Sequence, residues 1–235
     1  MQFGLLQLWE GGWISALLRG ATITVLVGLC AMFAGLVIGI ICGLIKWGRL
    51  KPLSWLVDIY TTVVRGVPEL LIIYLLFFSS VEFVTRVANA FGWSGLADTG
   101  YAFIIAVIAI AAISGSYSTE VVRGALSSIP KGHLEAARAL GMPGPRIFRK
   151  IILPQMLRIA VPGMNNVWQA TMKDTALVSV VGLQELMRAA SVGAGSTRNP
   201  FIFYLIAAVV YLCITFVSQF FFKRAERSLM LKGRG

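Results

Sequence analysis

Four ionisable residues stand inside otherwise apolar stretches of this sequence. Arg65 and Glu69 are separated by a short segment that contains Pro68, and Lys173 is followed at once by Asp174. An ionised side chain at the centre of a lipid bilayer costs about 2.5–3.5 kcal/mol on insertion scales, so such residues usually face a bundle interior or a water-filled path. These four residues are therefore the ones best suited to contact a polar solute within a membrane.

The segment around Pro68 has two interpretations. Proline lacks the backbone N–H, so Pro68 should break or kink the helix that carries Arg65 and Glu69. Broken helices at membrane depth commonly line a substrate site, which makes Glu69 and Arg65 candidates for a substrate pathway. Alternatively, the two residues are four apart and could form a structural ion pair along one helix face.

The segment around Asp174 offers a second set of candidates. A cationic solute would favour Asp174, and Thr175 and Asn166 offer uncharged donors and acceptors for a polar head group. Polar residues in membrane bundles also serve as links between helices, and this alternative stays open. Glu120 and Arg123, three residues apart, are expected to form an ion pair at the end of a span rather than a site.

The sequence gives little support to catalytic or metal chemistry. His133 is the only histidine, and the cysteines Cys30, Cys42 and Cys213 lie in apolar runs without a CxxC motif. The phosphate-binding pattern GxxxxGK[ST] is absent from the sequence. We therefore expect no catalytic residue, no metal site and no cofactor bound by this chain itself.

The composition indicates that lipid is the solvent for much of the chain. Hydrophobic residues make up 57% of it and charged residues only 13%, against about 25% charged residues in a typical soluble domain. The net charge of +11 could suggest nucleic acid. However, the basic residues are spread between the apolar runs, as the positive-inside rule requires of cytoplasmic loops. We expect no nucleic-acid partner.

The apolar runs predict an all-α membrane protein with a single domain over residues 1–235. The first uncharged run, Gly20 to Ile45, would be roughly 39 Å long as a helix, enough to cross a core of about 30 Å. It is too long for a signal peptide and should stay in the membrane. The five expected transmembrane helices lie at about 20–45, 53–81, 99–122, 155–184 and 199–222.

The distribution of basic residues predicts the orientation. Segments 46–52, 123–158 and 223–235 would share one side of the membrane and carry 15 Lys and Arg residues (3, 7 and 5). The other side, with the loops at 82–98 and 185–198, carries four. We therefore expect a periplasmic N-terminus and a cytoplasmic C-terminus in a multi-pass protein of the bacterial inner membrane.

The long inside loop is expected to have a structure of its own. Pro130 can open a helix over about 131–140, and Gly141 can end it, with two prolines just beyond. A second helix should start near Arg146 and lead into the next span. The loop therefore reads as a short helix, a tight turn and a return to the membrane.

The first loop helix presents small residues beside charges. Ala136, Ala137 and Ala139 would make a close-packing surface, flanked by Glu135 and Arg138. A groove on a partner protein could accept such a helix. An interfacial helix on lipid headgroups is the alternative, although the large apolar face that membrane docking needs is missing.

The loop resembles the EAA loop of binding-protein-dependent ABC permeases. Glu135-Ala136-Ala137, then Gly141, then Ile151-x-Leu153-Pro154 match that motif with its full spacing. Three further segments are similar to polar amino-acid permeases, and most of all to those for histidine, lysine/arginine/ornithine and opines. These segments are 65–68 (RGVP), 116–124 (SYSTEVVRG) and 173–182 (KDTALVSVVG).

The resemblance implies a fold, partners and a mechanism. The fold would be the type I ABC importer (MetI-like) permease fold, with 131–140 as the coupling helix that docks on an ATPase and Glu135, Ala136, Ala137, Arg138 and Gly141 as its coupling residues. The implied partners are a dimer of ATP-binding subunits that holds ATP and Mg, a second permease chain in a heterodimer, a periplasmic substrate-binding protein and the lipid bilayer. Basic amino acids or opines would pass from periplasm to cytoplasm by alternating access, and the segment matching Asp174-Thr175 contacts cargo in some members.

Two other functions remain as alternatives. A gradient-driven secondary amino-acid transporter should show an internal inverted repeat and paired acids deep in its spans. Five spans do not divide into equal halves, and no repeat is visible. A membrane-embedded enzyme would need a nucleophile, a metal or a carboxylate cluster, which scattered acids and one histidine do not supply. The identity of the cargo and the number of cargo sites stay open.

Overall fold

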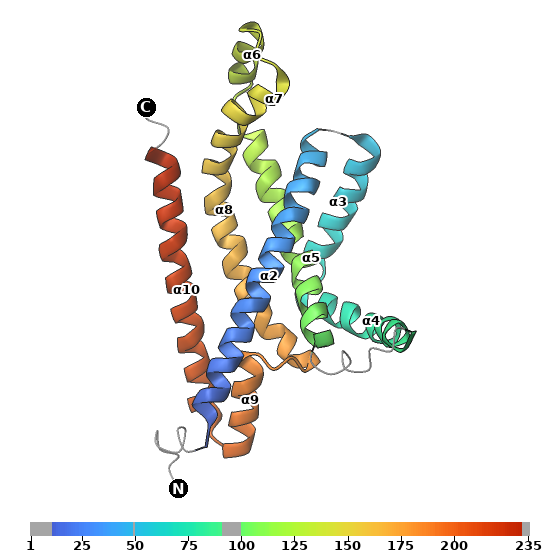
Figure 1. The fold of residues 1–235 in the computed structure, drawn as a ribbon, viewed down its shortest axis with the longest axis vertical. Coiled ribbons are helices and arrows are strands. Elements are labelled where there is room, and N and C mark those ends of the chain that lie inside the picture. Colours follow the sequence, from blue (N-terminus) through green and yellow to red (C-terminus); the bar gives the residue numbers. More distant parts are fainter. Residues whose placement is uncertain (1–10, 49, 91–99, 232–235) are drawn as a thin grey trace.

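The computed structural model describes residues 11–48, 50–90 and 100–231, and none of these residues lies in a strand. Three long apolar helices form the body of the molecule, namely α2 (Trp13–Trp47), α5 (Gly100–Ser127) and α10 (Pro200–Leu231). The other elements are α3 (Lys51–Gly66), α4 (Glu69–Ala90), α6 (Lys131–Ala139), α7 (Gly144–Ile147), the π-helical turn η1 (Phe148–Ile152), α8 (Leu153–Asp174), the 3₁₀ segment η2 (Thr175–Val181) and α9 (Leu186–Thr197). Figure 1 shows α6 and the C-terminus at the end of the molecule opposite the N-terminus.

The helices long and apolar enough to cross a membrane are α2, α5 and α10. Two bent pairs bring the number to at most five: α3 with α4, bent by 109°, and α8–η2 with α9, bent by 50°. The second and fourth expected spans are therefore interrupted rather than straight. The expectation that 185–198 is a loop is wrong, because α9 occupies most of it.

Helices α2 and α5 pack closely because α2 has glycines on the shared face. Gly35, Gly39 and Gly43 are four residues apart, the small-xxx-small spacing that lets helix backbones approach in membranes. A Cβ atom on Gly43 would lie 2.7 Å from Val122 Cγ1, and one on Gly35 would lie 3.0 Å from the Gly115 nitrogen. Larger side chains have no room at this contact, so the two helices form the centre of the bundle.

The inside loop folds back onto the end of α5. Ala137 of α6, Ile147 of α7 and Ile152 of η1 are buried in one cluster with Val122 and Leu126 of α5. This apolar contact fixes the loop against the bundle, and Figure 1 shows α7 lying between α6 and α8.

Helix α6 ends as its sequence predicts. Gly141 adopts a left-handed conformation with φ 69°, which glycine reaches without steric cost. Its N–H donates to the Arg138 carbonyl at 2.9 Å, and the Met142 N–H donates to the Ala137 carbonyl at 3.0 Å. This pair of bonds is a Schellman motif, which satisfies the last carbonyls of the helix and turns the chain sharply.

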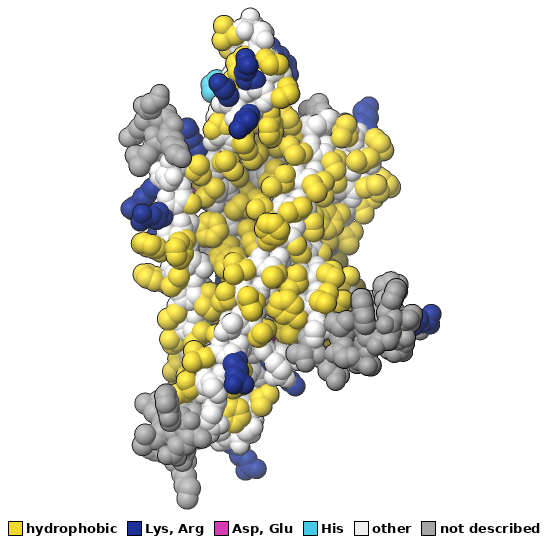
Figure 2. Space-filling view, viewed as in Figure 1, with side chains coloured by type: hydrophobic (Ala, Val, Ile, Leu, Met, Phe, Trp, Pro, Cys, Tyr) yellow, Lys and Arg dark blue, Asp and Glu magenta, His cyan; other side chains and the backbone are white. Residues whose placement is uncertain are grey.

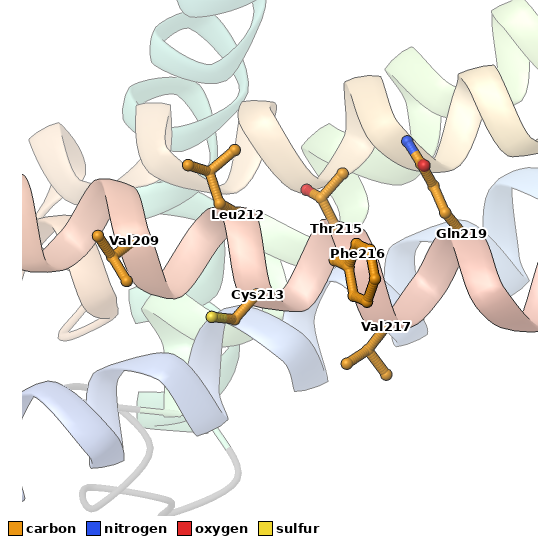
Figure 3. Close-up of a pocket in the computed structure, with 7 residues that line it drawn as sticks. All are labelled: Val209, Leu212, Cys213, Thr215, Phe216, Val217 and Gln219. Atoms are coloured by element: carbon orange, nitrogen blue, oxygen red, sulfur yellow. The ribbon is translucent and has the colours of Figure 1, made fainter.

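The outer surface has an apolar middle. On the face shown in Figure 2, hydrophobic side chains cover the middle of the molecule and Lys and Arg side chains lie toward its ends. On α10, Leu212 is 67% exposed and Phe216 is 77% exposed. A hollow lined by α10 alone includes both residues and only two polar side chains, Thr215 and Gln219, and Figure 3 shows these side chains along the helix. A surface of this kind requires lipid or another apolar chain as its surroundings.

Candidate functional site

The break between α3 and α4 places two charged residues on either side of a sharp bend. Val67 is extended, with φ −103° and ψ 138°, as expected for a residue that precedes proline. Arg65 lies in the last turn of α3, and Glu69 is the first residue of α4. The predicted break at Pro68 is confirmed, and the 109° bend turns Arg65 and Glu69 away from a common helix face.

Tyr117 of α5 connects the two sides of the bend. Its hydroxyl donates a hydrogen bond to Glu69 Oε1 at 3.1 Å. The guanidinium carbon of Arg65 lies 5.5 Å from the centre of the same ring, within the range of a cation–π interaction. The alternative of an Arg65–Glu69 ion pair is wrong, since each residue contacts Tyr117 and no such pair occurs among the described ion pairs.

Asp174 completes this group from a fourth helix. It is the last residue of α8, is half-buried, and lies within electrostatic range of both Glu69 and Tyr117. We call Arg65, Glu69, Tyr117 and Asp174 the bend cluster. Neither of its carboxylates takes part in an ion pair within the described part of the chain. Lys173, the residue before Asp174, also lies within electrostatic range of this carboxylate.

The other two pathway candidates lie elsewhere. Thr175 is fully buried, and its hydroxyl donates to the Met172 carbonyl at 2.6 Å and lies 3.5 Å from the Tyr211 hydroxyl. Asn166 is exposed and precedes Asp174 by eight residues, or about 12 Å along the helix axis. The bend cluster thus brings together three of the five candidates. Tyr117 lies in the segment 116–124 (SYSTEVVRG), but the sequence alone did not predict it as a site residue.

A buried carboxylate that the sequence did not single out joins three helices. Glu185 is fully buried and caps α9 by accepting the Arg188 N–H at 2.7 Å. It also accepts bonds from the Thr24 hydroxyl of α2 at 3.1 Å and from the Tyr211 hydroxyl of α10 at 3.2 Å. These donors satisfy the charge, so Glu185 fixes α9 against α2 and α10.

A second charged cluster lies at the opposite end of α2. Lys46 Nζ is 2.7 Å from Asp58 Oδ1 of α3 and 2.6 Å from Glu120 Oε1 of α5. Arg123 Nη2 is 2.8 Å from Glu120 Oε2, which confirms the expected Glu120–Arg123 pair. We call Lys46, Asp58, Glu120 and Arg123 the paired cluster. Every charge in it has a partner within 3 Å, so it links α2, α3 and α5.

The residues of the expected coupling helix divide between two faces. Glu135, Ala136 and Arg138 are exposed on α6, whereas Ala137 is only 2% exposed and packs inward. The expected surface of small residues is therefore wrong in part, because Ala137 is buried in the chain's own core. Leu140, at the end of the helix, is 81% exposed and adds an apolar contact to the outer face.

Metal coordination finds no support in the described residues, where no group of three His, Cys, Asp or Glu side chains could hold an ion. The site is therefore one of charge and hydrogen bonding. The bend cluster can hold a small ion that carries both signs of charge, and the exposed face of α6 can contact a partner.

Comparison with known proteins identifies the family of the chain. Residues 35–230 match the model of the binding-protein-dependent transport system inner membrane component. The chain is 46% identical over 229 residues to the nopaline transport system permease protein NocQ of Agrobacterium fabrum, covering 97% of this chain and 96% of the relative. It is 37% identical over 210 residues to the histidine/lysine/arginine/ornithine transport system permease protein HisQ of Escherichia coli, covering 88% and 90%.

The fold has a counterpart among solved structures. A crystal structure of an amino acid ABC transporter with histidines matches with a TM-score of 0.81 at 27% identity, over 97% of this chain and all of the other. The sequence and structural matches extend over nearly the whole chain. This chain therefore belongs to the inner-membrane permease components of binding-protein-dependent ABC transport systems.

Proposed function

We propose that this permease passes a small basic amino acid, or an opine that carries a guanidinium group, across the membrane at the bend cluster. The observation that supports this proposal is the approach of Glu69 and Asp174 beside Tyr117, where neither carboxylate forms an ion pair within the described residues. Like charges at close range repel each other, so a cation between them is stabilised.

The charges of the bend cluster complement those of a basic amino acid. Such a molecule has two cationic groups and one carboxylate. Glu69 and Asp174 can accept hydrogen bonds from the cationic groups, and Arg65 can donate to the carboxylate, since guanidinium suits carboxylate geometry.

The names of the relatives favour an amino-acid or opine cargo. Two of them are named for nopaline and for histidine, lysine, arginine and ornithine. Each of these relatives is similar to this chain over about nine tenths of its length or more. Family membership also favours the ATP-driven importer over the gradient-driven transporter.

The partners and the mechanism follow from membership in this family. We propose that the chain pairs with a second, different permease, and that a dimer of ATP-binding subunits, which holds ATP and Mg, binds the exposed face of α6. A loaded periplasmic binding protein docks at the α9 end. The N-terminus is then periplasmic and the C-terminus cytoplasmic. ATP-driven closure moves α6, and the spans alternate between outward-facing and inward-facing states.

The cargo is tested with the complete complex reconstituted in lipid. ATP hydrolysis is measured with the binding protein added empty and then loaded with arginine, histidine or glutamine. Stimulation by the basic cargoes alone is expected, and stimulation by glutamine alone would remove the basic-cargo proposal. No stimulation by any loaded protein, with an intact complex, would contradict the importer mechanism.

Variants separate the site from the rest of the bundle. Glu69→Gln removes one carboxylate of the bend cluster and should abolish arginine uptake. Asp58→Asn removes a carboxylate of the paired cluster and serves as the matched control, because Asp58 is half-exposed and lies away from the bend. Equal losses in both variants would show that the effect is general rather than specific to the site.

The coupling role of α6 is tested separately. Glu135→Lys reverses a charge on the exposed face, and Gly141→Asp places a side chain at φ 69°, where non-glycine residues are strained. Both variants should reduce transport while membrane insertion stays intact. Normal uptake by both would rule out docking through α6. Lys223→Glu, a charge reversal at the end of α10, provides the control.

A further inference from the structure

A basic hollow lies where the inside loop returns to the membrane. Pro145, Arg146, Arg149 and Lys150 line a space of about 470 Å³. The three cationic residues are exposed and come from α7 and η1, immediately before α8 begins at Leu153. Figure 2 shows Lys and Arg side chains gathered at this end of the molecule. Three cations in so short a segment form a strong local positive field.

The three cations have no anionic partner in the described part of the chain. None of the side-chain hydrogen bonds or ion pairs there involves Arg146, Arg149 or Lys150, whereas Lys46 and Arg123 are both paired. Glu135 is the only acidic residue between positions 123 and 158. Because like charges repel, the folded loop is stabilised by any anion that enters the hollow.

The surroundings favour an anion with an apolar tail. Leu153 and Leu157 follow Lys150 at i+3 and i+7, which places them near the same helical stripe. Leu157 is 36% exposed, and Leu153 is half-buried. A positive group followed by a half-buried and an exposed leucine at the start of a span matches a phospholipid, whose phosphate lies directly above its acyl chains.

The position within the fold also favours a lipid over a protein partner. Figure 1 shows α7 between α6 and α8, so the hollow lies nearer to the spans than the helix expected to dock on the ATPase. Basic pockets at the cytoplasmic ends of spans are known to suit anionic lipid headgroups. An acidic protein surface would leave the leucines below the hollow uncovered.

We propose that Arg146, Arg149 and Lys150 bind the headgroup phosphate of an anionic phospholipid, with an acyl chain lying along Leu153 and Leu157. The bound lipid fixes the point at which α8 enters the membrane. Since α6 and α7 precede that point, the lipid also helps to set the position of α6 relative to the spans.

The test uses the assembled transporter in lipid nanodiscs that contain phosphatidylglycerol and phosphatidylcholine in equal amounts. Native mass spectrometry measures which lipid stays bound after release of the complex. The wild type should retain phosphatidylglycerol in preference. Each basic residue near an anionic surface strengthens binding about fivefold, so Arg146→Gln with Arg149→Gln and Lys150→Gln should lower the preference on the order of 100-fold.

The matched control removes the same charge from another place at the same end. Lys223→Gln with Arg224→Gln and Arg227→Gln acts on exposed cations at the end of α10, outside the hollow. This variant should keep the wild-type lipid preference. Equal loss of preference in both triple variants would overturn the proposal, because it would show general attraction to the membrane surface.

Two further measurements keep the outcome clear if the glutamine variant assembles poorly. Arg146→Lys with Arg149→Lys retains all three charges and should retain the lipid. Failure to do so, in an assembled complex, would contradict binding through charge. Displacement of the lipid by excess inorganic phosphate would contradict the proposed contact of an acyl chain with Leu153 and Leu157. If the glutamine variant keeps its lipid but loses the ATP-binding subunits, the hollow is a protein-docking surface and the proposal is wrong.

Discussion

The two charged clusters of the bundle contain similar residues but differ in how their charges are paired. In the paired cluster, Lys46 and Arg123 satisfy Asp58 and Glu120 at 2.6–2.8 Å. In the bend cluster, neither carboxylate forms an ion pair within the described residues; Glu69 accepts a hydrogen bond from Tyr117, and Arg65 lies over the Tyr117 ring.

The difference lies in what each cluster leaves unsatisfied. A fully paired group of charges links helices and has no capacity for a solute. The bend cluster leaves its carboxylates without ion pairs within the described residues, and Arg65, Glu69 and Asp174 lie at helix ends, which tolerate a change in geometry better than a helix centre. Ion pairing, rather than charge content, thus distinguishes a site from a structural link.

The largest effect that would test this distinction is on transport through the bend cluster. Asp174→Asn should lower arginine uptake on the order of 100-fold, because removal of one partner of a desolvated charge pair has an effect of that size. The thermal unfolding midpoint should stay at the wild-type value, since Asp174 makes no ion pair in the described structure. Uptake in proteoliposomes and unfolding in detergent provide the measurements, and undiminished arginine uptake would contradict the assignment.

Substitutions in the paired cluster should lower the stability of the fold and leave cargo recognition unchanged. Lys46→Met leaves Asp58 and Glu120 without their shared cation, and the folded state should lose about 2 kcal/mol, less than a fully buried pair because Asp58 is 56% exposed. The KM for loaded binding protein should not change. Lys46→Arg keeps the charge and serves as the control. A changed cargo preference in Lys46→Met would break the distinction between the clusters.

A smaller loss of stability is expected when Glu185 is replaced. Its side chain is buried, and its oxygens accept hydrogen bonds from Arg188, Thr24 and Tyr211. Glu185→Gln keeps an oxygen that can cap α9 but weakens the charged hydrogen bonds from Thr24 and Tyr211, so about 1 kcal/mol should be lost. Glu185→Ala should lose more. Hydrogen exchange of the α9 amides measures the effect, and wild-type protection in both variants would contradict the role of Glu185 as a link.

The smallest effect should come from Tyr117. Tyr117→Phe removes the hydrogen bond to Glu69 but keeps the ring that faces Arg65. The apparent affinity for arginine should fall about fivefold, the effect of one hydrogen bond. Tyr60→Phe removes another partly buried hydroxyl, which bonds the Ala112 carbonyl, and is the control. An equal fall in both would mean that the hydroxyl of Tyr117 has no special part in the site.

Local signals allowed some of these features to be predicted from the sequence. Pro130 and Gly141 bracket α6 as expected, and Pro68 breaks its helix. In each case a residue with a restricted or unusual backbone conformation determines where a helix begins, ends or breaks within one turn of its own position. The segment of α9 was missed because its inward residues, such as Ala190, Gly193 and Ala194, are too small to give a strong hydrophobic period.

The long-range contacts could not be predicted in this way. Nothing near Lys46 in sequence identifies Glu120 as its partner, and the direction of the bend at Pro68 depends on how α4 packs. Glu185 is the first residue of the segment 185–198, which was expected to be a loop, and acids in loops are usually solvated, so the sequence does not predict its burial. Tyr117 became a site residue only when α3, α4 and α8 were placed around it. These contacts depend on the tertiary arrangement of the helices.

The glycine face between α2 and α5 limits how the bundle can move. Sliding one helix past another requires side chains that can exchange one packing arrangement for another. Gly35, Gly39 and Gly43 instead leave backbone against backbone, with Ser114 and Ser118 of α5 seated between them. We therefore expect α2 and α5 to move together in any cycle of opening and closing, and the breaks at Val67–Pro68 and at Gly182 to absorb changes in the backbone.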